Sequence, residues 1–211
     1  GLKRSKSNLS DTVGKFYSQI SIYISIIFLV LGTSYVISQL DLIINHYLPD
    51  KFNMEKYLIE VMDNNILFVI LAVVVIAPIT EEFLFRGIIL KGFLRNYSNR
   101  RAIIYSSLLF AVLHVNIRQM IYTFFLALII GWIYMKTRSL IIAIFAHSIN
   151  NLLPVASFHF ISRSEYQQAA EQALEMQAII SYTVVGIMFF LIGLLIFNHS
   201  LSDNKEIKIS S

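Results

Sequence analysis

Long apolar stretches separated by short polar segments run along most of the 211-residue chain. The first and the last, Phe16–Leu40 and Ile179–Phe197, hold no charged side chain. A helix needs about 20 mostly apolar residues to cross a bilayer. Four more stretches lie between them, at Asn65–Leu94, Ala102–Val115, Met120–Tyr134 and Leu140–Val155. We therefore predict an all-α fold, a polytopic bundle of about six transmembrane helices, with the shorter helices tilted or partly sheltered.

Composition strengthens this interpretation. Charged residues make up 14% of the chain and mean hydropathy is +0.67, whereas soluble domains carry about 25% charge. An ordinary soluble enzyme is thereby excluded, and the absence of Cys excludes disulfides and thiol nucleophiles. We treat 1–211 as a single membrane domain with tails at 1–15 and 199–211. Sizeable polar segments remain at 41–63 and at 157–177, where Ser162–Glu165 resembles a capping box that begins a polar helix.

The distribution of positive charge predicts the orientation. Six crossings place both termini on one side. If that side is inside, 12 Lys and Arg residues lie on inner segments, four lie on outer segments and Arg86 remains within the membrane. The positive-inside rule then places both termini in the cytoplasm. We expect a multi-pass protein of the cell membrane, bacterial by its Ile-, Asn- and Lys-rich composition, with the lipid bilayer and no nucleic acid as a partner.

One predicted span carries three charges, and intramembrane charges are functional candidates by default. Glu82 and Arg86 are four residues apart on one helix face, which predicts a self-neutralised ion pair. Glu81 points about 100° away and has no local partner. It must be protonated, paired from another helix, or placed in a wet cavity. Pro78 frees a backbone carbonyl one turn earlier in the same helix.

Two other spans carry imidazoles. His114 follows Phe110 by four residues, and His147 precedes Asn151 by four. At about 1.5 Å per residue from the cytoplasmic helix ends, these groups and Glu81 lie between about 12 and 21 Å deep. A carboxylate that accepts a proton from water, two imidazoles and an amide donor are the components of a hydrolytic site. No G-x-S-x-G or H-E-x-x-H motif competes with this interpretation.

Three motifs in order resemble a known family. The segment 78–87 contains Glu81-Glu82-x-x-x-Arg86, followed by Phe110-x-x-x-His114 and His147-x-x-x-Asn151. Together they resemble the CAAX protease and bacteriocin-processing (CPBP, or Abi) family of intramembrane proteases, over a catalytic core of about 70–153. The resemblance implies that Glu81 is the general base and His114 its partner in activating water. It also implies that His147 and Asn151 form the oxyanion hole and that Glu82 and Arg86 are supporting residues.

Metal dependence and biological role stay open at this level. Glu81, His114 and His147 would make a zinc set of two histidines and a carboxylate. We favour a metal-free glutamate mechanism, because the nearest replacement base, Glu82, is committed to Arg86. The expected substrate is a membrane-associated peptide or protein, such as a bacteriocin or pheromone precursor. The alternatives are a non-proteolytic immunity or regulatory scaffold protein and a proton-coupled transporter.

Overall fold

The computed structural model describes residues 14–47, 61–62, 65–114, 116–160 and 175–209, and within these ranges no strand occurs. The helices are α2 (Ile20–Tyr47), α6 (Asn99–Val112), α7 (Ile117–Thr137), α8 (Leu140–Phe160), α10 (Met176–Ile209) and a composite helix of η1 (Ile70–Ile76), α4 (Ala77–Glu82), η2 (Phe83–Leu90) and α5 (Lys91–Phe93). The all-α helical bundle is confirmed. The predicted capping box at 162–165 lies outside the described residues.

Five helices are long and apolar enough to cross a membrane, at Ile20–Ile44, Asn65–Phe93, Ile117–Thr137, Leu140–Ser157 and Met176–Asp203. The sixth predicted span, α6, has only 14 residues, which is about 21 Å of helix and less than the hydrocarbon thickness of about 30 Å. It begins at the charged segment 99–101 and ends at Val112, before His114. The expectation that His114 lies on a transmembrane helix is therefore wrong, because this residue occupies the turn between α6 and α7.

Several helices extend beyond the apolar stretches that predicted them. α2 continues beyond Leu40 to Tyr47, into the predicted polar segment at 41–63. α10 reaches Ile209, so the expected C-terminal tail continues the helix. Polar side chains end an apolar pattern without ending the backbone hydrogen bonds of a helix. Asp41, for example, lies in α2 and forms an ion pair with Arg118 at the start of α7, 2.6 Å between Oδ2 and Nη2.

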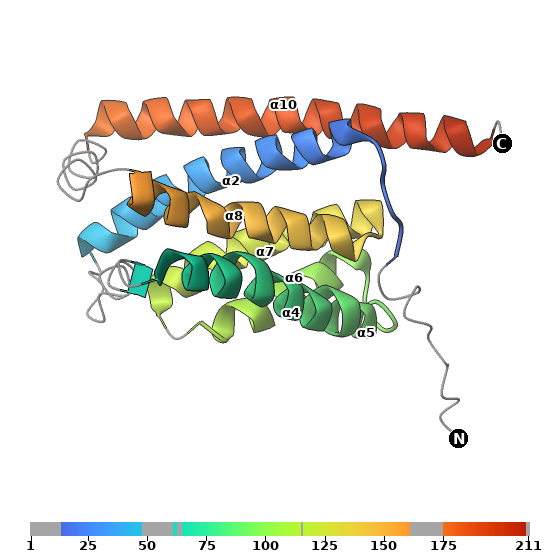
Figure 1. Cartoon of the computed structure of the whole chain (residues 1–211), viewed down its shortest axis with the longest axis horizontal. Coiled ribbons are helices and arrows are strands. Elements are labelled where there is room, and N and C mark those ends of the chain that lie inside the picture. The colour runs from blue at the N-terminus through green and yellow to red at the C-terminus, as the bar shows by residue number, and fades with distance from the viewer. Residues whose placement is uncertain (1–13, 48–60, 63–64, 115, 161–174, 210–211) are drawn as a thin grey trace, which may run out of the picture.

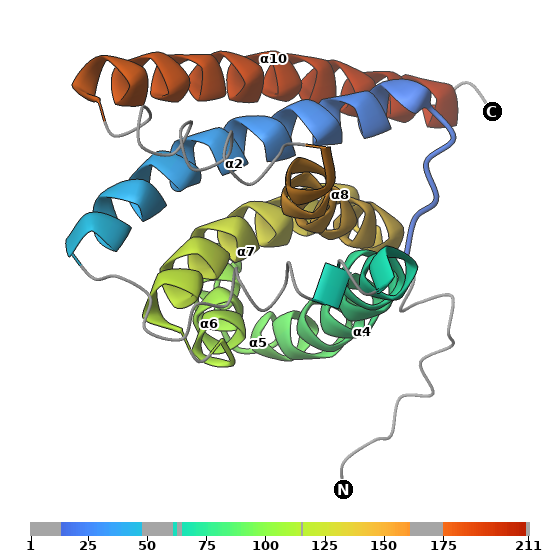
Figure 2. The same cartoon turned by 60° about the vertical axis from the view of Figure 1, so that its left-hand side comes forward.

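The helices form successive layers (Figures 1 and 2). α10 packs along α2, α2 packs on α7 and α8, and α6 and the composite helix complete the side farthest from α10. The largest cluster of buried apolar side chains lies where α2, α7 and α8 meet, and it includes Ile26, Ile130 and Ile142. This core holds α7 and α8 in place beside the composite helix.

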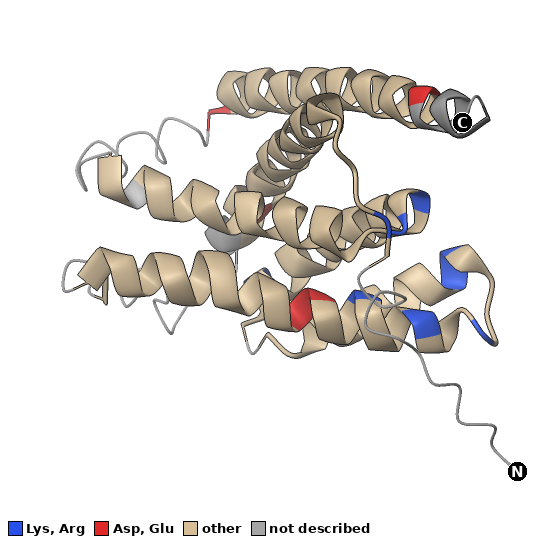
Figure 3. Ribbon diagram, turned by 45° about the vertical axis from the view of Figure 1, so that its right-hand side comes forward, with Lys and Arg blue, Asp and Glu red and all other residues tan. Residues whose placement is uncertain are grey.

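Most of the described Lys and Arg residues lie at one end of the bundle (Figure 3). The start of α2, the α5–α6 connection, the α7–α8 turn and the end of α10 all lie at that end (Figure 1). The described basic residues there are Lys15, Lys91, Arg95, Arg100, Arg101, Lys136 and Arg138. The charge asymmetry that was predicted from loops is thus a property of the folded bundle.

The composite helix contains two π-helical segments that the sequence pattern did not predict. In η1, the N–H of Ala77 bonds to the carbonyl of Ala72, five residues earlier. In the same register, the next carbonyl, that of Val73, would accept from residue 78. Because Pro78 has no N–H, the Val73 carbonyl has no backbone donor in this register. The carbonyl freed by Pro78 lies just before the charged segment.

Candidate active site

The supporting pair forms at the junction of α4 and η2. Arg86 Nη1 donates to Glu82 Oε1 over 2.9 Å, and both side chains are buried, with exposed fractions of 2% and 0%. Arg86 Nη2 donates to the carbonyl of Ala127 in α7, also over 2.9 Å. The ion pair that the spacing predicted is therefore present, and it also ties the composite helix to α7.

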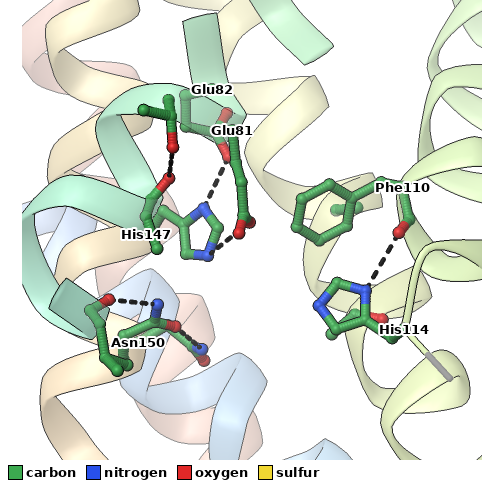
Figure 4. A network of polar contacts seen from close by, with 12 residues as sticks. Glu81, Glu82, Phe110, His114, His147 and Asn150 are labelled. Carbon is green, nitrogen blue, oxygen red and sulfur yellow. Dashed lines mark hydrogen bonds and ion pairs between the residues drawn. The ribbon is translucent and has the colours of Figure 1, made fainter. Parts of the chain in front are cut away.

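His147 extends this pair towards Glu81 (Figure 4). Its Nδ1 lies 2.8 Å from Glu82 Oε1, the oxygen that also accepts from Arg86. A carboxylate at this distance fixes the proton on Nδ1, because an ionised carboxylate only accepts hydrogen bonds. The other ring nitrogen, Nε2, then lies 3.8 Å from Glu81 Oε2. Of the three carboxylate and imidazole groups in this row, Glu81 alone is partly exposed, with 36% of its side chain accessible.

His114 lies beside the Phe110 ring (Figure 4). The Phe110 ring contacts both imidazoles, with centroid distances of 5.1 Å to His114 and 5.8 Å to His147. His114 Nδ1 lies 3.1 Å from the Phe110 carbonyl, which places the proton on Nδ1 and leaves Nε2 available. The cation of Arg86 stacks 5.4 Å from the same ring. Phe110 thus sets the spacing of the two histidines.

The carboxamide of Asn151 in α8 bonds to the composite helix at the point where Pro78 interrupts the backbone hydrogen bonds. Its Nδ2 donates to the Val73 carbonyl over 2.9 Å, the carbonyl that Pro78 leaves without a backbone donor. Its Oδ1 accepts from Nδ2 of the neighbouring Asn150 over 3.2 Å. One N–H of the Asn151 carboxamide remains for another acceptor. The fourth residue of the predicted site is therefore held at the edge of the composite helix.

The structure brings together most of the predicted residues. Glu81, Glu82, Arg86 and His147 form one continuous polar row, and Asn151 lies one turn beyond His147 on α8. No hydrogen bond or ion pair joins Glu81 to His114 among the described side chains. The sequence interpretation overlooked Asn150, Ser34 and Tyr122, which form a second polar cluster behind Asn151. Their signal was present, since each is a polar residue within an apolar helix.

The zinc alternative finds little support in this geometry. Among the residues that the structure describes, no group of three His, Asp or Glu side chains is arranged to hold a metal ion. In the described part of the chain, His114 forms no hydrogen bond or ion pair with Glu81 or His147, and its Nδ1 lies against the Phe110 carbonyl instead. The residues present do not fit a metal of that ligand set.

Comparison with protein families gives one match. Residues 63–153 match the family described as Rce1-like, type II CAAX prenyl endopeptidase Rce1-like, a branch of the CPBP proteases. The Rce1-like segment includes the composite helix, α6, α7 and most of α8, and so contains all three motifs, while α2 and α10 lie outside it. No curated protein and no solved structure matches the chain.

Proposed function

We propose that this protein is an intramembrane endopeptidase that hydrolyses a peptide bond in a membrane-associated peptide. The observation that carries the proposal is the row Arg86–Glu82–His147–Glu81, which lies within the Rce1-like segment and ends at the partly exposed Glu81 carboxylate. Buried charges at membrane depth are costly. A row that keeps one carboxylate accessible serves proton transfer better than it serves stability.

In the proposed reaction, the Glu81 carboxylate accepts a proton from water as the water oxygen attacks the carbonyl carbon of the substrate. His114, whose free Nε2 can bond to the same water, helps to orient it. The oxygen of the tetrahedral intermediate accepts hydrogen bonds from the remaining N–H of Asn151 and from His147 Nε2. Glu81 then gives its proton to the leaving nitrogen and the C–N bond breaks. The donor role of His147 requires a proton on Nε2 as well as on Nδ1.

The role of Glu81 can be tested with a conservative replacement. Loss of a general base lowers rates by about 10²- to 10⁴-fold. We expect Glu81→Gln to lose cleavage by that factor in proteoliposomes that contain a quenched fluorogenic, membrane-inserted peptide. Glu175→Gln is the matched control, because Glu175 is an exposed carboxylate at the start of α10. Equal cleavage by Glu81→Gln and wild type would overturn the role of Glu81 as the general base. A cellular phenotype that both Glu81→Gln and His114→Ala retain would favour the scaffold alternative.

The substrate that we propose is a bacterial peptide precursor of the bacteriocin or pheromone type. Comparative peptidomics of cells with wild-type protein and cells with Glu81→Gln identifies the peptide and its cleavage site. Accumulation of a prenylated peptide instead would assign the substrate class that the family description names. Exhaustive chelation tests the metal-free mechanism, which predicts unchanged activity. Complete loss that added zinc restores would contradict it.

A further inference from the structure

Asn150 is a buried amide in α8 with an exposed fraction of 6%, and it connects three helices. Its Oδ1 accepts from Tyr122 Oη of α7 over 2.8 Å and from Ser34 Oγ of α2 over 3.2 Å. Its Nδ2 donates to Asn151 Oδ1 over 3.2 Å. Neither Ser34 nor Tyr122 belongs to a catalytic motif, and α2 lies outside the Rce1-like segment. The cluster therefore links the surrounding bundle to the candidate oxyanion donor.

The direction of these hydrogen bonds follows from the Val73 carbonyl. A carbonyl oxygen can only accept, so the amide nitrogen of Asn151 faces Val73. Asn151 Oδ1 then faces Asn150 and needs a donor, which the Asn150 amide nitrogen supplies. Asn150 Oδ1 is turned towards Ser34 and Tyr122, whose hydroxyl groups must donate to it. Each contact fixes the next, from the helix break at Pro78 to the hydroxyl groups on α2 and α7.

From this order we infer that Asn150, supported by Tyr122 and Ser34, is a positioning residue that fixes the carboxamide of Asn151. The inference rests on the proposed function, in which the second N–H of Asn151 binds the oxyanion. Oxyanion donors act by being held in place before the charge develops. An amide free to turn would present oxygen to the oxyanion as readily as nitrogen. The network prevents that turn.

The first test removes one hydroxyl group from the network. We expect Tyr122→Phe to lower kcat about fivefold, the effect of losing one hydrogen bond of about 1 kcal/mol, while KM changes little. Tyr23→Phe is the matched control, because the Tyr23 hydroxyl near the start of α2 donates to the Tyr17 carbonyl and takes no part in the Asn150 network. Asn150→Asp should lower kcat further, since an ionised carboxylate cannot donate to Asn151 Oδ1. Equal effects of Tyr122→Phe and Tyr23→Phe would overturn the inference.

A double-mutant cycle separates positioning from general destabilisation. In an Asn151→Ala background no carboxamide remains to be fixed, so Tyr122→Phe should leave kcat unchanged. If Tyr122→Phe lowers kcat by the same factor in both backgrounds, the network does not act through Asn151 and the inference fails. Glu81→Gln is measured in the same assay. Loss of activity in Glu81→Gln with an additive cycle would refute the positioning role alone. Full activity of Glu81→Gln would refute the Glu81-dependent mechanism on which this inference rests, and absence of cleavage by the wild-type protein would refute the proposed function itself.

Discussion

A single carboxylate oxygen organises the candidate site at the residue scale. Glu82 Oε1 accepts from Arg86 and lies against Nδ1 of His147, while Glu82 Oε2 has no hydrogen-bond partner among the described atoms. A buried ion pair is weak evidence for stability, because desolvation offsets its attraction. The geometry is better explained by positioning. Glu82 fixes the ring of His147 so that Nε2 faces Glu81, and Arg86 neutralises the charge that this requires.

This division of roles predicts that stability and activity can be separated. Glu82→Gln leaves the buried Arg86 cation with neutral acceptors, the Gln amide oxygen and the Ala127 carbonyl, and without the carboxylate of its ion pair. This loss should lower the free energy of unfolding by about 3–5 kcal/mol. The double variant Glu82→Gln/Arg86→Met removes the stranded cation, so thermal unfolding in detergent should show most of the loss recovered. Its cleavage activity should stay low, because His147 has lost its carboxylate. Asp41→Asn, in a partly exposed pair, should cost about 1 kcal/mol or less. Recovery of full activity in the double variant would contradict the positioning role of Glu82.

At the scale of helices, small residues hold α10 against α2. A Cβ at Gly193 would lie 2.7 Å from the backbone nitrogen of Leu29, and one at Gly186 would lie 2.9 Å from Tyr35 Cβ. Without a hydrophobic driving force inside a bilayer, close backbone approach is how helices gain packing energy. The two helices outside the Rce1-like segment are thus joined as a unit. Ser34 belongs to the α2 helix of this unit, and its hydroxyl group donates to Asn150 of α8.

A methyl group at this contact should be poorly tolerated. Gly193→Ala must move backbone atoms of α2, which typically costs about 1–3 kcal/mol, so the thermal unfolding temperature in detergent should fall. Gly92→Ala is the control, because nothing lies within 4 Å of a Cβ there and alanine favours the helix. An equal response of the two variants would show that the α2–α10 contact does not need glycine.

At the scale of helices, sequence patterns predict features that depend on local geometry and miss those that depend on contacts between helices. Apolar length predicted the helices, and spacing predicted the Glu82–Arg86 pair, because both depend on local geometry. The α6–α7 turn at His114 and the two π-helical segments depend on backbone hydrogen bonds that no apolar pattern encodes. Pro78 gave the one local signal, a freed carbonyl, but its partner Asn151 comes from another helix. The position of His147 between both glutamates required the packing of α8 on α4.

At the scale of the whole molecule, the distribution of basic residues predicts how the protein is oriented in the membrane. Helix directions alternate, so that the start of α2 and the end of α10 lie at the same end, together with the basic cluster (Figures 1 and 3). At the opposite end, the described basic side chain Arg118 is neutralised by Asp41. Positive charge resists transfer across the membrane. The basic end should therefore face the cytoplasm, with the substrate site between the two ends.

Cysteine labelling can test this orientation directly, because the sequence contains no cysteine that would react in the background. Asn96 lies in the α5–α6 connection at the basic end, and Gln177 lies at the start of α10 at the opposite end, both exposed. A membrane-impermeant maleimide added to intact cells should label Gln177→Cys and leave Asn96→Cys unlabelled. Permeabilised cells should show both variants labelled, which controls for the reactivity of each site. Labelling of Asn96→Cys alone in intact cells would invert the topology and place the basic cluster outside, against the electrostatic bias that the charge distribution predicts.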